Sequence, residues 1–122
     1  DNKMFVGGAG IVAAHLVGLG ANATFISVVG KDETSKTASE MISNYGVKPI
    51  FIHDSSRPTV LKQRFRAGSK TLLRVSNLRS HDVAEEQANE IYHQFLVAIE
   101  KTDLVVFSAF NYSKINMIIV QN

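Results

Sequence analysis

The chain has 122 residues, of which 45% are hydrophobic and 20% are charged, values typical of a soluble globular domain with a modest core. Its formal net charge of +2 is too small to indicate binding to nucleic acid or to a membrane surface. It has no cysteine, which excludes disulfides and thiolate metal sites, and no apolar run of about 18 residues that could span a bilayer. We therefore expect a cytoplasmic protein.

The first part of the chain predicts alternating strands and helices. Residues 4–6 form a short apolar run that predicts a strand, and apolar side chains at helical spacing predict a helix over residues 11–19. Residues 23–29 are rich in β-branched and aromatic side chains and predict a buried strand. A second helix is expected over residues 33–45, because Asp32 and Glu33 mark its start and a glycine follows its end.

A β-hairpin interrupts this alternation. Residues 49–53 have the composition of a strand, and residues 59–67 alternate between apolar and basic side chains. After a Gly-Ser turn, the chain resumes an apolar run over residues 71–75, so the two segments predict a hairpin. Insertions of this kind often cover a ligand, and we expect residues 48–76 to form such a lid.

Strand and helix alternate again after the hairpin. A helix is expected over residues 83–101, a buried strand over 104–107, and the beginning of a further helix over 113–122. The whole chain, residues 1–122, then forms one incomplete α/β domain: a parallel sheet layered with helices, with the hairpin inserted. Because the sequence opens on Asp1 without a methionine or a leader, we expect it to be a piece of a longer protein.

The glycine-rich stretch from Gly7 to Gly10 lies between the first expected strand and helix. Glycines allow a ligand to approach the backbone, and the free N–H groups at a helix start can face an anion or hydroxyl groups. A tight turn that packs the helix on the sheet explains the stretch equally well. Residues 8–13 also match the dinucleotide-binding pattern G-x-G-x-x-A, with Asp32 as a candidate ribose ligand. These interpretations remain open at this point.

Basic side chains follow one face of the expected hairpin: Lys62, Arg64 and Arg66 on the first strand and Arg74 on the second. Clustered cations repel one another unless they are solvated or matched by anions, so a phosphate-bearing ligand would explain them. A solvated edge that prevents strand aggregation would explain them too.

Other polar residues give weaker signals. Ser108 and Tyr112 follow a strand, where α/β proteins often bind ligands, but a loop role is equally compatible. The four histidines, His15, His53, His81 and His93, do not have the spacing of metal ligands. We therefore expect no metal site within this chain.

Several segments, taken together, resemble the ribokinase-like (PfkB) family of carbohydrate kinases. Residues 7–21 resemble its substrate-side pattern G-G-A-x-N-V-A-x-N-L-A-x-L-G-A, and residues 25–32 resemble the strand and G-x-D turn that follow. Residues 57–65 and 72–75 resemble the lid of the heptose-phosphate kinases, R-P-T-x-x-K-x-R and Q-L-L-R-x-D. Residues 105–108 with Tyr112 resemble a strand followed by a loop of S-D-Y or S-D-F-N-Y type.

The resemblance implies a partial ribokinase-like fold and the transfer of the ATP γ-phosphate, with Mg²⁺, to a sugar hydroxyl. A heptose 7-phosphate, as in ADP-heptose synthesis for lipopolysaccharide, is the sharpest substrate it suggests. It further implies that the hairpin folds back across the glycine turn and covers a pocket, with a homodimer formed through the lid as a further expectation. The implied substrate-binding residues are Gly7, Gly8 and Gly10 for the sugar and Lys62, Arg64 and Arg74 for its phosphate.

The chain also departs from the family pattern. Ile11 stands in place of the usual sugar-binding asparagine and cannot donate a hydrogen bond to a hydroxyl. The family's later G-A-G-D segment, which provides the catalytic base, and its nucleotide-binding strands have no counterpart here. We therefore expect no catalytic residue in this chain and no kinase activity from it alone. A dinucleotide-binding unit and a noncatalytic binding or dimerisation module remain the alternatives.

Overall fold

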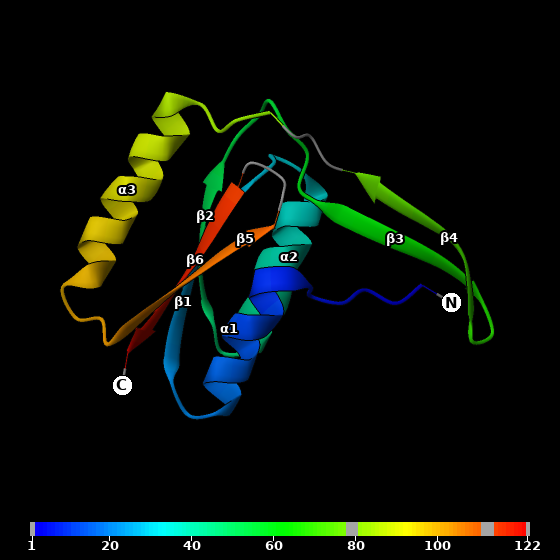
Figure 1. The fold of residues 1–122 in the computed structure, drawn as a ribbon, viewed down its shortest axis with the longest axis horizontal. Coiled ribbons are helices and arrows are strands. Elements are labelled where there is room, and N and C mark those ends of the chain that lie inside the picture. Colours follow the sequence, from blue (N-terminus) through cyan, green and yellow to red (C-terminus); the bar gives the residue numbers. More distant parts are fainter. Residues whose placement is uncertain (1, 78–80, 111–113, 122) are drawn as a thin grey trace.

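A four-stranded sheet forms the centre of the molecule, with the strand order β2-β1-β6-β5 (Figure 1). The computed structural model describes residues 2–77, 81–110 and 114–121. The sheet strands are β1 (Asn22–Val29), β2 (Lys48–His53), β5 (Leu104–Phe110) and β6 (Lys114–Gln121).

The sheet is mixed. Strands β1 and β2 are parallel, with Val28 opposite Ile52, and are connected through helix α2 (Glu33–Asn44). Strand β6 is antiparallel to both of its neighbours and places Ile118 opposite Phe25 of β1 and Val106 of β5. The predicted α/β class with an inserted hairpin is confirmed, and the parallel pairing is that of β1 with β2.

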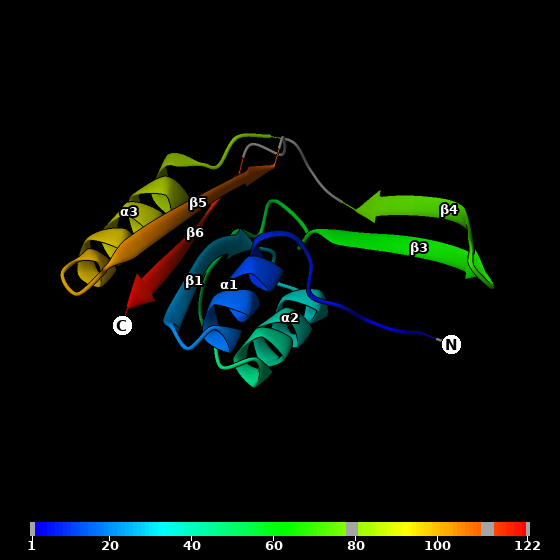
Figure 2. The same cartoon turned by 60° about the horizontal axis from the view of Figure 1, so that its bottom comes forward.

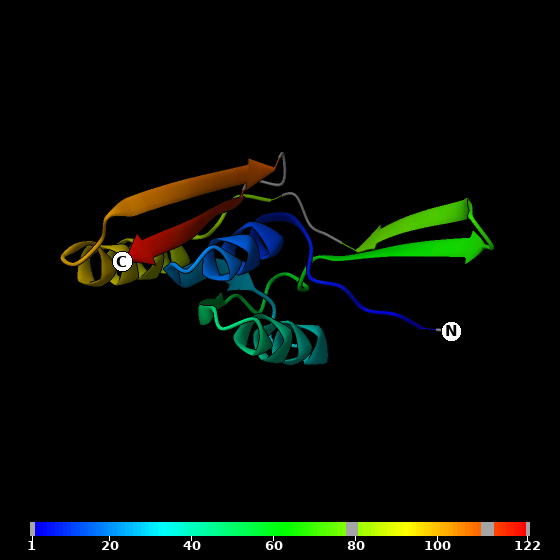
Figure 3. The same cartoon turned by 90° about the horizontal axis from the view of Figure 1, so that it is seen from below.

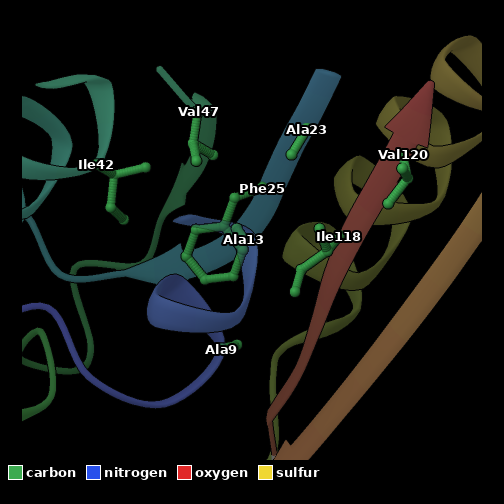
Figure 4. Close-up of a cluster of buried hydrophobic side chains, with 8 residues drawn as sticks. All are labelled: Ala9, Ala13, Ala23, Phe25, Ile42, Val47, Ile118 and Val120. Carbon is green, nitrogen blue, oxygen red and sulfur yellow. The ribbon is translucent and has the colours of Figure 1, made fainter. Parts of the chain in front are cut away.

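Helices α1 (Gly8–Gly18) and α2 cover one face of the sheet (Figure 2). The small side chains of α1 allow it to lie close to the strands, because Ala13 is fully buried against the large residues of the sheet. Figure 4 shows this first core, in which the side chains converge between helix and sheet. Its buried members are Ala9, Ala13, Ala23, Phe25, Ile42, Val47, Ile118 and Val120.

Helix α3 (Glu85–Ile99) covers the opposite face, where Ile91, Phe95 and Ala98 pack on a second core. The buried members of that core are Ile26, Val28, Ile52, Met117 and Ile119. The helix expected over residues 83–101 is therefore confirmed. Within the part of the chain that the structure describes, no helix is both long and apolar enough to cross a membrane.

The last segment contradicts the sequence-based expectation. A helix was expected over residues 113–122, but the described part of this segment is strand β6. The four consecutive residues Met117 to Val120 are all buried, two toward each core, and β6 is paired on both sides. A helix would leave half of such a run exposed, whereas a central strand buries both faces.

Two shorter expectations are also wrong. Residues 4–6 form no strand, and the Phe5 side chain is 79% exposed. Strand β5 exists, but Leu104 is half exposed and Phe107 is 62% exposed. The reason is that β5 lies at an edge of the sheet, where the helices cover its faces only in part.

The hairpin extends away from the sheet (Figures 1 and 3). It consists of β3 (Leu61–Ala67) and β4 (Lys70–Asn77), which pair antiparallel in a separate two-stranded sheet. Gly68 adopts φ 58° in the connecting turn, a conformation that favours glycine. We refer to residues 61–77 as the hairpin arm. The lid was predicted over residues 48–76, but strand β2, which falls within this range, belongs to the main sheet and not to the hairpin arm.

Replacing a core residue tests this packing. Ile118→Ala removes a side chain with no exposed surface and should lower the free energy of unfolding by about 2–5 kcal/mol. The control Val97→Ala alters a side chain that is 64% exposed and should change it by less than about 0.5 kcal/mol. Urea denaturation measures both, and equal effects would contradict the assignment of the core.

Candidate functional site

The three glycines of the predicted site have different environments. Gly7 precedes α1 with an extended backbone, and a Cβ placed on it would meet no atom within 4 Å. Gly8 adopts φ 54° and is exposed. Gly10 is buried, and a Cβ there would lie 2.5 Å from Val6 Cγ1 and 3.5 Å from Ile42 Cδ1. Gly10 is therefore explained by packing against α2, whereas Gly7 and Gly8 border open space.

The start of α1 has no side-chain cap among the described residues and no acidic residue in its first turn. Its first N–H groups are the ones that a helix cannot satisfy internally, so they are suited to donate hydrogen bonds to an anion or a hydroxyl oxygen. Contact with such a ligand is what the sequence predicts for the glycine turn. Gly7 and Gly8 are exposed and suited to it, whereas Gly10 is buried.

A row of polar residues crosses the sheet on the face covered by α1. Ser27 of β1 donates a hydrogen bond to Asn116 Oδ1 of β6 over 2.6 Å, and Asn116 lies opposite Ser108 of β5. The row continues the alternation set by Phe25 and Ile118, which face α1. Ser108 was singled out from the sequence; Ser27 and Asn116 were missed, although each is a polar residue inside an apolar strand. Tyr112 lies outside the described residues.

The hairpin arm presents its cations on one face. Arg64 is directly opposite Arg74, and Lys62 lies two residues from Arg64 on the same face, opposite Ser76. Like charges directly opposite one another destabilise a strand pair. An anion between the two guanidinium groups would relieve this repulsion through charge-assisted hydrogen bonds. Arg66 lies beyond a register shift and donates a hydrogen bond to the Ser69 carbonyl oxygen.

The opposite face of the arm is apolar and exposed. Phe65 pairs with Leu73, and Val75 pairs with Gln63. The Phe65 and Leu73 side chains are each about half exposed. The arm is therefore amphipathic across its two faces, with cations on one and apolar side chains on the other.

The arm does not cover the glycine turn. In Figure 3 it projects from one end of the molecule, while α1 lies against the sheet. Two open depressions among the described residues have volumes of about 450 and 460 Å³, and none of the six predicted binding residues lines either of them. The expected pocket between arm and glycine turn is thus not closed in this structure. The structure brings the three cations together but keeps them apart from the glycines.

One of the depressions lies where the arm joins the body, in a hydrogen-bonded region that we call the hairpin root. Its members are Gly30, Asp32, Asp54, Arg57, Thr59 and His81. Asp32 caps α2 by accepting a 2.9 Å hydrogen bond from the Ser35 amide. It also accepts from the Thr59 amide at 2.8 Å and from the Thr59 hydroxyl at 2.7 Å. The same hydroxyl accepts a hydrogen bond from the Gly30 amide.

These bonds bear on the dinucleotide interpretation. Both carboxylate oxygens of Asp32 are engaged by Ser35 and Thr59, so Asp32 is committed to structure rather than presented to a ribose. The pattern also requires a strand before the glycines, and residues 4–6 form none. The geometry therefore disfavours a dinucleotide site at the glycine turn.

Arg57 joins the two ends of the arm. Its Nε donates to Asp54 Oδ2 over 2.7 Å, on the side where the chain enters β3. Its Nη2 donates to the carbonyl oxygens of His81 and Asp82, at 3.0 and 2.9 Å, on the side where the chain has left β4. Sequence reasoning noted Arg57 only within a family pattern and gave no sign that it is buried.

The carboxylates of the hairpin root have perturbed acidities. Partial burial opposes ionisation of Asp32, but hydrogen bonds from Thr59 and Ser35 outweigh it and hold its pKa below the ordinary value. The Ser56 hydroxyl, helped by the Ser56 amide and the Arg57 guanidinium, lowers the pKa of Asp54 despite burial. Among the described residues, no group of three or more histidine and carboxylate side chains is placed to hold a metal ion.

The protein is an α/β protein, and its glycine turn at the start of α1 and cation-bearing hairpin are the elements that the resemblance to carbohydrate kinases implies. A family model described as pfkB family carbohydrate kinase matches residues 1–121. The chain belongs to the pfkB family of carbohydrate kinases.

Individual relatives agree with this family. The chain is 32% identical over 110 residues to the bifunctional protein HldE of Rhodopseudomonas palustris, and the aligned region covers 88% of this chain and 22% of that protein. It is 34% identical over 97 residues to HldE of Paramagnetospirillum magneticum, covering 79% of this chain and 19% of that protein. A D-beta-D-heptose 7-phosphate kinase of Bordetella bronchiseptica is 40% identical over 70 residues, 57% of this chain and 22% of the relative. The chain thus spans about a fifth of the length of these relatives.

The hairpin root predicts how stability depends on pH. Because the folded-state pKa values of Asp32 and Asp54 lie below the ordinary value of 3.8, the unfolded state binds more protons in acid. The stabilisation is present above 3.8 and should be lost as the pH falls through that value and below it. Melting temperatures measured between neutral pH and pH 3 should show a smaller decline for Asp54→Asn than for the native chain. Equal declines would contradict this assignment.

Proposed function

We propose that the intact protein transfers the γ-phosphoryl group of ATP to a hydroxyl of a sugar or sugar phosphate, and that this chain provides the substrate side and the hairpin arm. The pfkB family supports the reaction class. The relative named D-beta-D-heptose 7-phosphate kinase supports a heptose 7-phosphate as the substrate. The observation that carries the proposal is the pairing of Arg64 with Arg74, because an anionic substrate would relieve the repulsion between these two cations.

The residues of this chain would act by binding and positioning. Lys62, Arg64 and Arg74 bind the phosphate that the sugar already carries, and the open N–H groups at Gly7 and Gly8 contact its hydroxyls. On binding, the ligand would draw the arm from the direction that it has in the free chain toward the glycine turn, which would exclude water from the bound sugar. Phosphoryl transfer depends mainly on alignment and charge stabilisation, so such closure would contribute much of the rate.

The donor side of the reaction lies elsewhere. ATP with Mg²⁺ supplies the phosphoryl group, but the described residues include no metal-ligating cluster, so we assign neither group to side chains of this chain. We likewise place the catalytic base, which takes the proton of the attacking hydroxyl, outside this chain. The isolated chain is then expected to bind a substrate without turning it over.

A second copy of the chain is the partner that the arm suits best. The apolar face formed by Phe65, Leu73 and Val75 is exposed, and a two-stranded sheet alone is only marginally stable in water. Two such faces packed together would bury these side chains while leaving both cationic faces open. We propose a cytoplasmic homodimer formed through the arm.

Ligand binding tests the proposed substrate. A heptose 7-phosphate should raise the melting temperature of the chain, because it binds the folded state, whereas NAD should not. Arg64→Gln and Arg74→Gln should each weaken binding about 10-fold to 100-fold, since a hydrogen bond to a charged group contributes about 1.5–3 kcal/mol. The control Gln63→Ala changes the other face of the arm and should bind normally. Stabilisation by NAD alone would instead favour a dinucleotide-binding unit.

Molecular mass tests the proposed dimer. Light scattering should give twice the chain mass for the native protein and the single chain mass after the double substitution Phe65→Ser and Leu73→Ser. Gln63→Ser introduces the same residue on that face without removing an apolar contact, and should remain dimeric. A native chain that is monomeric at high concentration would rule out the arm as a dimer interface.

A further inference from the structure

Both ends of the hairpin arm are attached to the body at the same place. Arg57 lies four residues before β3, and His81 and Asp82 lie beyond the end of β4. The Arg57 guanidinium bonds to Asp54 on one side and to the His81 and Asp82 carbonyl oxygens on the other. A further hydrogen bond joins the Ser56 hydroxyl to His81 Nε2 over 2.9 Å. The Arg57 side chain, together with this Ser56 bond, therefore holds the two ends of the arm together.

The burial of Arg57 indicates that its role is geometric. Its side chain is 0% exposed, and that of Asp54 is 5% exposed. A buried ion pair is a weak source of stability, because desolvating two charges offsets most of their attraction. An apolar side chain would fill the same space at lower cost. Only a planar guanidinium donates hydrogen bonds in several fixed directions at once, here to three residues.

A second attachment lies two residues further on. Thr59 bonds to Asp32 through its amide and its hydroxyl, and the hydroxyl also accepts from the Gly30 amide. The chain passes so close to Gly30 that a Cβ there would lie 2.6 Å from the Arg57 carbonyl oxygen and 2.7 Å from the Thr59 nitrogen. Pro58, between the two attachments, has a fixed φ. The direction in which the chain enters β3 is thus determined by residues 57–59.

Beyond this point the arm pairs mainly with itself. Nearly all side chains of β3 and β4 are exposed, and the two strands pair with each other rather than with the main sheet. Its direction relative to the body must therefore be set at the hairpin root. We propose that Arg57 is a positioning residue: by holding both ends of the arm to the body, it determines the direction in which Lys62, Arg64 and Arg74 are presented. Only the link to substrate phosphate rests on the function proposed above.

The direction of the arm in solution tests this inference. Residual dipolar couplings of backbone amides in the full 122-residue chain should fit one common alignment for arm and body in the native protein. Arg57→Lys keeps the charge but cannot make the three directional bonds, so the arm should lose the common alignment while its own cross-strand ladder persists. Arg66→Lys, an arginine-to-lysine change on the arm itself, should keep it. A common alignment in Arg57→Lys would overturn the proposal.

A second variant covers the case in which Arg57→Lys does not fold. Asp54→Asn has nearly the same shape but leaves one side-chain oxygen, in place of two, to accept from both Ser56 and Arg57. It should weaken the attachment of Arg57 and loosen the arm, and retention of the common alignment in this variant would then overturn the proposal. Titration of the same samples with a heptose 7-phosphate separates the two ideas. Weaker binding with the arm released supports both. Unchanged binding with the arm released supports the positioning role of Arg57 and contradicts substrate binding by the arm.

Discussion

The close crossing of residues 57–59 over Gly30 is the constraint on which the rest of this structure depends. At this point the Thr59 hydroxyl lies between the Gly30 amide and the Asp32 carboxylate, with hydrogen bonds of 3.0 and 2.7 Å. The same carboxylate begins α2, so one side chain joins the end of β1, the start of a helix and the base of the arm. Glycine is required at position 30 because backbone atoms occupy the space of a Cβ.

Local sequence patterns were sufficient for elements whose signals are local. Asp32 predicts the start of α2 because a carboxylate caps a helix at short range, and the alternation of residues 59–67 predicts β3. Strand β6 was missed because four consecutive apolar residues fit a buried strand and a buried helix equally well. Its assignment depends on pairing with β1, about ninety residues earlier, which no local pattern records.

The candidate site was predictable in composition but not in arrangement. The glycine pattern marks a helix start, yet only packing against Val6 and Ile42 distinguishes Gly10 from the two open glycines. The basic residues share a face because strand side chains alternate, which is a local property. We infer that the direction of the arm is set by hydrogen bonds from Arg57 to His81 and Asp82, which lie 24 and 25 positions later in the sequence. Whether the arm covers the glycine turn could therefore not be judged from local sequence patterns.

The position of β6 has a consequence for how this fold is made. Strand β6 lies between β1 and β5 in the sheet but follows both of them in sequence, so during synthesis these two strands emerge before the one that joins them. Before β6 forms, β1 has only β2 as a partner among the described strands, and β5 has none. The edge of β1 from Asn22 to Ile26 then waits for a segment about ninety residues further along the chain, and pairings between such distant segments form late.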